Sequence, residues 1–66
     1  MRYEIQVGGR LGETLRYAFP ALRARVLGKD TVLSGVFADQ AALYGVLAQL
    51  EALGLDLIEV RRLPAA

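Results

Sequence analysis

The stretch that decides the fold runs from Asp39 to Leu63 and reads DQAALYGVLAQLEALGLDLIEVRRL. Its first part predicts an amphipathic α-helix, because apolar residues recur at helical spacing on one stripe. That stripe consists of Leu43, Val46, Leu47, Leu50 and Leu53. Asp39 is placed to accept hydrogen bonds from the first helical turn, and Gly54 stands where a helix commonly ends in a left-handed conformation.

A β-strand is predicted directly after this helix, over residues 55–60, ended by Arg61, Arg62 and Pro64. Strict alternation along a strand sends neighbouring side chains to opposite faces. It therefore predicts one face with Leu55, Leu57 and Leu63 and another with Ile58 and Val60. A single layer of helices cannot cover both sets, so we expect some leucine to stay exposed.

The N-terminal half supplies three more strands and a short helix. Residues 2–7 alternate, with Tyr3, Ile5 and Val7 toward the helices, and Gly8-Gly9 ends that strand. Residues 11–19 have apolar residues at helical spacing before Pro20, which predicts a short helix that needs tertiary packing to form.

Residues 21–37 predict a β-hairpin, because two alternating segments flank the turn residues Gly28-Lys29-Asp30. Gly35 interrupts the second of these strands, which indicates a bulge or a close backbone approach.

Together these elements predict one α+β domain over residues 1–66, with a loose tail from Leu63 to Ala66. With the strands numbered along the chain, right-handed crossovers give an antiparallel sheet in the order 4-1-3-2, with both helices on one face. This is a compact ferredoxin-like β-α-β-β-α-β sandwich. If residues 11–19 form a loop instead, the order becomes β-β-β-α-β.

Composition points to self-association. A chain of 66 residues buries only about 60% of its unfolded surface, yet 55% of the residues are hydrophobic and 12 are leucine. Cysteine and histidine are absent, so disulfides, thiolate sites and the usual zinc ligands are excluded. We therefore expect a homodimer that holds no metal and no cofactor.

Charge excludes some classes of partner. Eight basic residues are interspersed with seven acidic ones, and Tyr3 points inward, so the sequence does not predict a nucleic-acid interface.

No apolar run is long enough to span a bilayer, and Met1 to Glu4 lacks the apolar core of a signal peptide. The expected location is the cytoplasm.

Two surfaces are candidates for the dimer interface. The first is a smooth helix face opposite the leucines, formed by Ala41, Gly45, Ala48 and Ala52, although alanine on a solvated face would look the same. The second is the open face of the sheet, with Leu57 and Leu63 as surplus apolar residues. There Glu4 and Glu59 would pair with arginines of a second chain, namely Arg23, Arg25 or Arg61. A merely solvated sheet is the alternative.

Chemically reactive groups are few. The segment Gly8-Gly9-Arg10-Leu11-Gly12 could cradle an anion, but it lacks the spacing of a nucleotide-binding motif, and an ordinary turn is favoured. Ser34 is the one serine, and an acid/base mechanism would depend on a carboxylate or on Tyr3, Tyr17 or Tyr44.

The C-terminal half also resembles a known group. It carries residues 34–47, SGVFADQAALYGVL, followed by Leu53-Gly54-Leu55 and Val60-Arg61-Arg62. This pattern is similar to that of a group of small uncharacterised bacterial proteins. The resemblance implies a recurring scaffold and transfers no catalytic or binding residue.

The sequence thus favours a non-enzymatic homodimeric module that binds a protein partner or a small ligand. The alternative is a small dimeric α+β enzyme of the isomerase or lyase type, with a tyrosine or a carboxylate as acid or base.

Overall fold

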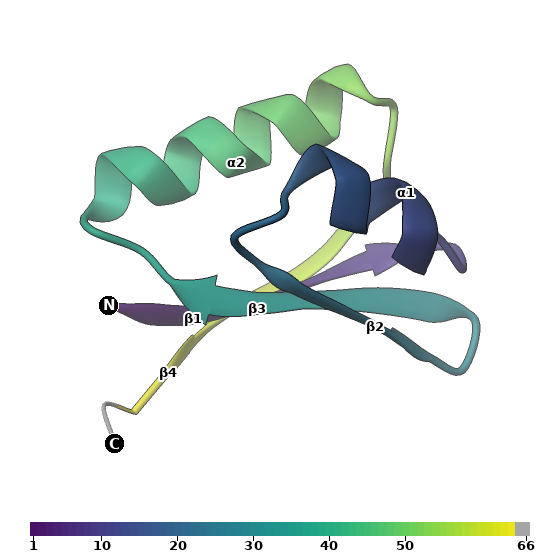
Figure 1. Cartoon of the computed structure of the whole chain (residues 1–66), viewed down its shortest axis with the longest axis horizontal. Helices are drawn as coiled ribbons and strands as arrows, with labels where there is room; N and C mark the ends of the chain where they lie inside the picture. The colour runs from purple at the N-terminus through teal and green to yellow at the C-terminus, as the bar shows by residue number, and fades with distance from the viewer. Residues whose placement is uncertain (65–66) are drawn as a thin grey trace.

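A computed structural model describes residues 1–64 as a four-stranded antiparallel sheet covered on one face by two helices (Figure 1). The elements are β1 (Arg2–Gly8), α1 (Gly12–Ala18), β2 (Arg23–Leu27), β3 (Asp30–Val36), α2 (Gln40–Ala52) and β4 (Leu57–Leu63). The strand order is β2-β3-β1-β4. The predicted α+β class, element order and strand order are confirmed, and the alternative without a first helix is wrong.

The core lies between the sheet and the helices. Tyr3, Ile5 and Val7 of β1 point into it, as the alternation predicts, and meet Leu43 and Leu50 of α2 in one apolar cluster. Burial of such side chains is the dominant favourable term in folding. The covered face of the sheet therefore supplies most of the stability.

Helix α1 has only seven residues and depends on contacts with the rest of the fold. Leu15 is fully buried and Phe19 nearly so, which is the packing that the sequence requires of a helix this short. Before the helix, the buried hydroxyl of Thr31 donates to the Gly9 carbonyl over 2.6 Å and accepts from the Leu11 N–H over 2.8 Å. These bonds attach the loop after β1 to strand β3.

The β2–β3 hairpin has the predicted position, with Gly28 in the left-handed region at φ 63°. The pairing of β3 with β1 continues through Gly35 without a register shift, so a bulge is excluded at that residue. A Cβ at Gly35 would lie 2.6 Å from Cδ2 of Leu22. Gly35 therefore permits the close approach of the segment that precedes β2.

Helix α2 begins and ends where the sequence predicts. The Asp39 carboxylate accepts a hydrogen bond from the Ala42 N–H over 2.9 Å, and Gly54 is left-handed at φ 76°. Val46 and Leu47 pack against the core beside the two buried leucines. Leu53 is the one residue of the predicted apolar stripe that is not packed against the core. It lies beyond the last helical residue and is 52% exposed.

Strand β4 differs from its prediction in three ways. It begins at Leu57 rather than Leu55, and it continues through Arg61 and Arg62 to Leu63. Charged residues do not end it, because the edge of a sheet leaves their side chains in solvent. Leu63 is thus part of the strand rather than of a loose tail, and the remaining tail residues, 65–66, lie outside the described part of the chain.

The third difference is a β-bulge at Ile58. Gln6 pairs with Glu59 and Val7 pairs with Leu57, which leaves Ile58 without a partner on β1. Leu57 therefore shares the helix-covered face with Val60, while Leu63 lies on the open face. The predicted grouping of Leu57 with Leu63 is wrong, because the extra residue reverses the alternation.

Within residues 1–64, no helix is both long enough and apolar enough to cross a membrane.

Candidate functional site

The open face of the sheet, on the side away from the helices, brings polar residues of all four strands into one row. The strand register places Arg23 opposite Ser34, Ser34 opposite Glu4, and Glu4 opposite Arg61. Even-numbered residues of β1 and β3 and odd-numbered residues of β2 face this side, as strand alternation requires. The row therefore joins residues that are widely separated in the sequence.

Glu4 is the centre of this row. Its carboxylate lies 3.1 Å from an Arg61 guanidinium nitrogen and 3.4 Å from one of Arg25. Its side chain is only 21% exposed, whereas both arginines are largely in solvent. Glu4 thus makes within one chain the ion pairs that the sequence suggests between two chains. Glu59 has no ion-pair partner among residues 1–64.

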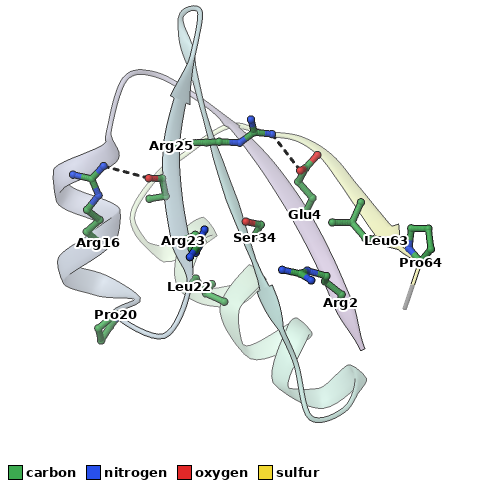
Figure 2. Close-up of a pocket in the computed structure, with 11 residues that line it drawn as sticks. Arg2, Glu4, Arg16, Pro20, Leu22, Arg23, Arg25, Ser34, Leu63 and Pro64 are labelled. Atoms are coloured by element: carbon green, nitrogen blue, oxygen red, sulfur yellow. Dashed lines mark hydrogen bonds and ion pairs between the residues drawn. The ribbon is translucent and has the colours of Figure 1, made fainter. Parts of the chain in front are cut away.

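A hollow of about 950 Å³ lies over one end of this face (Figure 2). Arg2 and Arg23 lie on either side of Ser34 in the middle of the hollow, as Figure 2 shows. Pro20 and Leu22 form one apolar end of it, and the other end consists of Leu63 and Pro64. The hollow is open to solvent and carries both charged and apolar surface.

Positive charge gathers in this hollow, although it is dispersed in the sequence. Four of the eight basic residues line it, and Glu4 is the one acidic residue that does so, which gives 4 − 1 = +3. The whole chain has a formal net charge of +1, so the rest of it carries −2. Sequence reasoning missed this cluster because it arises only when β1, α1 and β2 are brought together.

The predicted interface residues lie on separate surfaces. Ala41, Gly45, Ala48 and Ala52 are all exposed on α2, and a Cβ at Gly45 would meet no atom within 4 Å. Leu57 lies on the helix side of β4 and is 43% exposed, while Leu63 is half-buried at the hollow. The structure does not bring these six residues into one patch.

The glycine-rich segment after β1 is a structural turn. The N–H of Gly8 donates to the Asp56 carbonyl, that of Gly9 to the Lys29 carbonyl, and that of Leu11 to Thr31. Three of the five backbone donors that an anion cradle could use therefore already have protein acceptors. The ordinary turn that the spacing favours is the observed one.

The candidate acid/base groups lie far apart on different elements. Tyr3 is buried against Phe37, with ring centroids 5.9 Å apart in an edge-on contact. Tyr17 and Tyr44 are largely exposed on α1 and α2. Ser34 lies in the arginine-lined hollow, and within residues 1–64 no cluster of three or more acidic side chains is arranged to hold a metal ion.

The outer edge of β4 is a second feature that sequence reasoning did not identify as a site. The strand pairs only with β1, so its other side has no neighbouring strand within residues 1–64. Leu57, Ile58 and Val60 are large apolar residues with substantial exposure on this strand. Long apolar edge strands are ready templates for pairing with another chain.

Comparison with known protein families gave a match over most of the chain. A family model whose description reads domain of unknown function (DUF8691) matches residues 2–61. The match spans both halves of the chain, whereas the sequence resemblance rests on the C-terminal half. Neither the curated proteins nor the solved structures gave a match.

Proposed function

The chain belongs to the DUF8691 family, whose function is unknown, and we propose that it acts as a non-enzymatic homodimeric module that binds a protein partner or a small ligand. The observation that carries the proposal is the outer edge of β4, a strand of seven residues that pairs only with β1 within residues 1–64 and has three exposed apolar side chains. Pairing of two such edges would extend the sheet to eight strands and remove apolar surface from water.

The opposite edge of the sheet is less suited to pairing. Strand β2 has five residues, and Arg23 and Arg25 project from it into solvent. Arg16 of α1 reaches over this edge and donates to the Ala24 carbonyl over 3.4 Å (Figure 2). The shorter strand and the covered carbonyl both leave fewer free backbone groups for addition of a second strand.

The two interfaces suggested by the sequence have weaker support. Face-to-face packing of two open sheet faces would oppose the arginine-lined hollows of two chains, and like charges in contact are destabilising. The smooth helix face of α2 is exposed, and its alanines and glycine carry no charge that would select a partner.

Charges on β4 select one pairing register. Antiparallel edges related by a twofold axis through Val60 place Glu59 of each copy opposite Arg61 of the other, on the same face of the sheet. A centre at Glu59 would oppose two glutamates, and a centre at Arg61 would oppose two arginines. Opposite charges across a strand pair contribute about 0.2–1 kcal/mol each, and like charges destabilise. The register centred on Val60 is therefore the favoured one.

The experiment uses two single variants and their mixture. Glu59→Arg and Arg61→Glu each create like-charge pairs in a homodimer, so we expect each to weaken dimerisation about tenfold or more. Mixing the two variants restores both opposite-charge pairs and should give a heterodimer. Light scattering on a sizing column gives the masses, and native mass spectrometry of the mixture identifies the composition.

Two control variants test the interface further. Arg62→Glu makes the same charge change on the other face of β4 and should leave the dimer intact. Gly45→Leu fills the smooth face of α2 and should also leave it intact. A wild-type monomer would overturn the dimer, and failure of the mixture to associate would overturn the register centred on Val60. A monomeric Gly45→Leu variant would assign the interface to α2.

Two finer points are also proposals. The β-α-β-β-α-β order and the strand order support a ferredoxin-like classification, which superposition on an experimentally solved relative would test. A cytoplasmic location is the second proposal, and cell fractionation would test it.

A further inference from the structure

We propose that the arginine-lined hollow on the open face of the sheet binds an organic anion, in which a carboxylate or phosphate group is joined to an apolar body. This inference deepens the proposed function and rests on it, because it names the chemistry of the small ligand. The unpaired guanidinium groups, the concentration of positive charge and the apolar ends of the hollow support it.

Arg2 and Arg23 supply the charged part of the site. Neither has an ion-pair partner within residues 1–64, whereas Arg25 pairs with Glu4 and Arg16 lies 3.9 Å from Glu13. The guanidinium group of Arg2 extends from β1 toward Ser34, and Arg23 lies on the other side of that serine (Figure 2). A guanidinium fork matches the two oxygens of a carboxylate or phosphate and can bind them together.

Ser34 adds a polar group between the two arginines. Its hydroxyl makes no hydrogen bond to another group within residues 1–64, although the register fixes its position opposite both Arg23 and Glu4. A hydroxyl both donates and accepts, so it can donate to an oxygen held by the arginines. The strands β1, β2 and β3 fix the backbone positions of these three residues, so a ligand has only their side chains to order.

Glu4 does not cancel the positive charge at the ligand position. Its carboxylate interacts with Arg25 and Arg61 and not with Arg2 or Arg23. The hollow keeps a formal charge of +3 in a chain whose total is +1. An anion is therefore attracted to this face more than to the remaining surface, which carries a net −2.

The apolar ends of the hollow favour a ligand with a hydrocarbon part. Leu63 and Pro64 lie at one end, and Pro20 and Leu22 lie at the other. Small-molecule sites typically combine a few polar groups with apolar walls in hollows of about 300–1,000 Å³, and the 950 Å³ here falls in that range. An inorganic anion would use the arginines and leave these walls in water.

The test is a titration of the isotope-labelled full chain, followed by amide chemical shifts. The probes are hexanoate, hexyl phosphate, the neutral hexan-1-ol and inorganic phosphate. We expect hexanoate or hexyl phosphate to shift the amides of Arg2, Arg23 and Ser34 in a saturable manner, and the stronger of the two identifies the anionic group. Hexan-1-ol and inorganic phosphate should each bind at least tenfold more weakly.

Matched variants locate the binding site. Arg23→Gln should weaken binding about tenfold or more, because a charge-assisted hydrogen bond is lost. Arg10→Gln removes the same charge from an exposed loop outside the hollow and should bind as the wild type does. Equal weakening by both variants would overturn the site, as would equal binding of hexan-1-ol and hexanoate. Equal binding of inorganic phosphate and hexyl phosphate would overturn the apolar part of the site.

The oligomeric state, measured on the same samples, separates this inference from the proposed dimer. A dimer that binds none of the probes overturns the anion site alone. A monomer that binds hexanoate through Arg23 overturns the dimer alone.

Discussion

The two faces of the sheet differ in what holds their side chains in place. On the covered face, Ile5, Val7 and Leu33 are fully buried in the apolar core. On the open face, Arg23, Arg25 and Arg61 are exposed and interact through charge. The same strands thus carry one face whose burial stabilises the fold and another whose residues can be substituted without unfolding the protein. Substitutions that test function on the open face should therefore leave a folded protein.

The largest effect expected from this comparison is at Leu33. Leu33→Ala leaves a cavity in the centre of the covered face and should lower the free energy of unfolding by about 2–5 kcal/mol, which is a large part of the total for a domain this small. Urea denaturation followed by circular dichroism measures it. The matched control is Val36→Ala on the same strand, where the side chain is exposed on the open face and the loss should stay below about 0.5 kcal/mol. Equal losses in the free energy of unfolding at the two positions would contradict this difference between the two faces.

An intermediate effect is expected at Thr31, the buried polar residue of the covered face. Thr31→Val keeps the shape of the side chain but leaves the Gly9 carbonyl and the Leu11 N–H without their partner. We expect a loss of about 1–3 kcal/mol and faster hydrogen exchange at the Leu11 amide. Thr31→Ser retains the hydroxyl and should preserve protection at Leu11. Unchanged exchange in the valine variant would contradict a role for this hydroxyl in holding the loop.

The smallest effect is expected at Glu4, in the centre of the open face. Glu4→Gln removes the charge that pairs with Arg25 and Arg61 but keeps the shape of the side chain. Because both arginines are largely solvated, the loss of stability should be at most about 1 kcal/mol. It should shrink further in high salt, which screens exposed charges. Thermal unfolding at low and high salt checks this, and a large salt-independent loss would contradict it.

Much of the fold could be predicted because its signals are local. Asp39 and Gly54 mark the ends of α2 through their own backbone chemistry, and the alternation in residues 2–7 identifies β1. The strand order follows from the right-handed crossover rule once the elements are known. For these features, neighbouring residues in the sequence contain the necessary information.

The bulge at Ile58 could not be predicted, because no glycine or proline lies next to it and the apolar residues Leu57, Ile58 and Val60 suit a regular strand. It arises from how β4 fits against β1, and it reverses which face Leu57 occupies. The extension of β4 through Arg61 has a similar origin, since this arginine lies opposite Glu4 on the neighbouring strand. Both features depend on pairing between the two ends of the chain.

The arginine-lined hollow was missed for a related reason. Arg2, Arg16 and Arg23 belong to three different elements, and each one alone looks like an ordinary surface residue. Their meeting requires the register of β1, β2 and β3 as well as the position of α1. A sequence search for charge runs cannot find such a cluster, whereas a row-by-row map of the predicted sheet would have placed Arg23, Ser34 and Glu4 side by side.

The position of β1 has a consequence for the speed of folding. This strand comes first in the chain yet lies inside the sheet, between β3 and β4, and Arg2 pairs opposite Leu63. The β2–β3 hairpin needs only a tight turn, and hairpins form within about 1–10 μs. Closure of β1 against β4 must instead bring the two ends of the chain together, and the contacts between these strands form only after that loss of entropy. We therefore expect the rate of folding to be set by the meeting of these two strands.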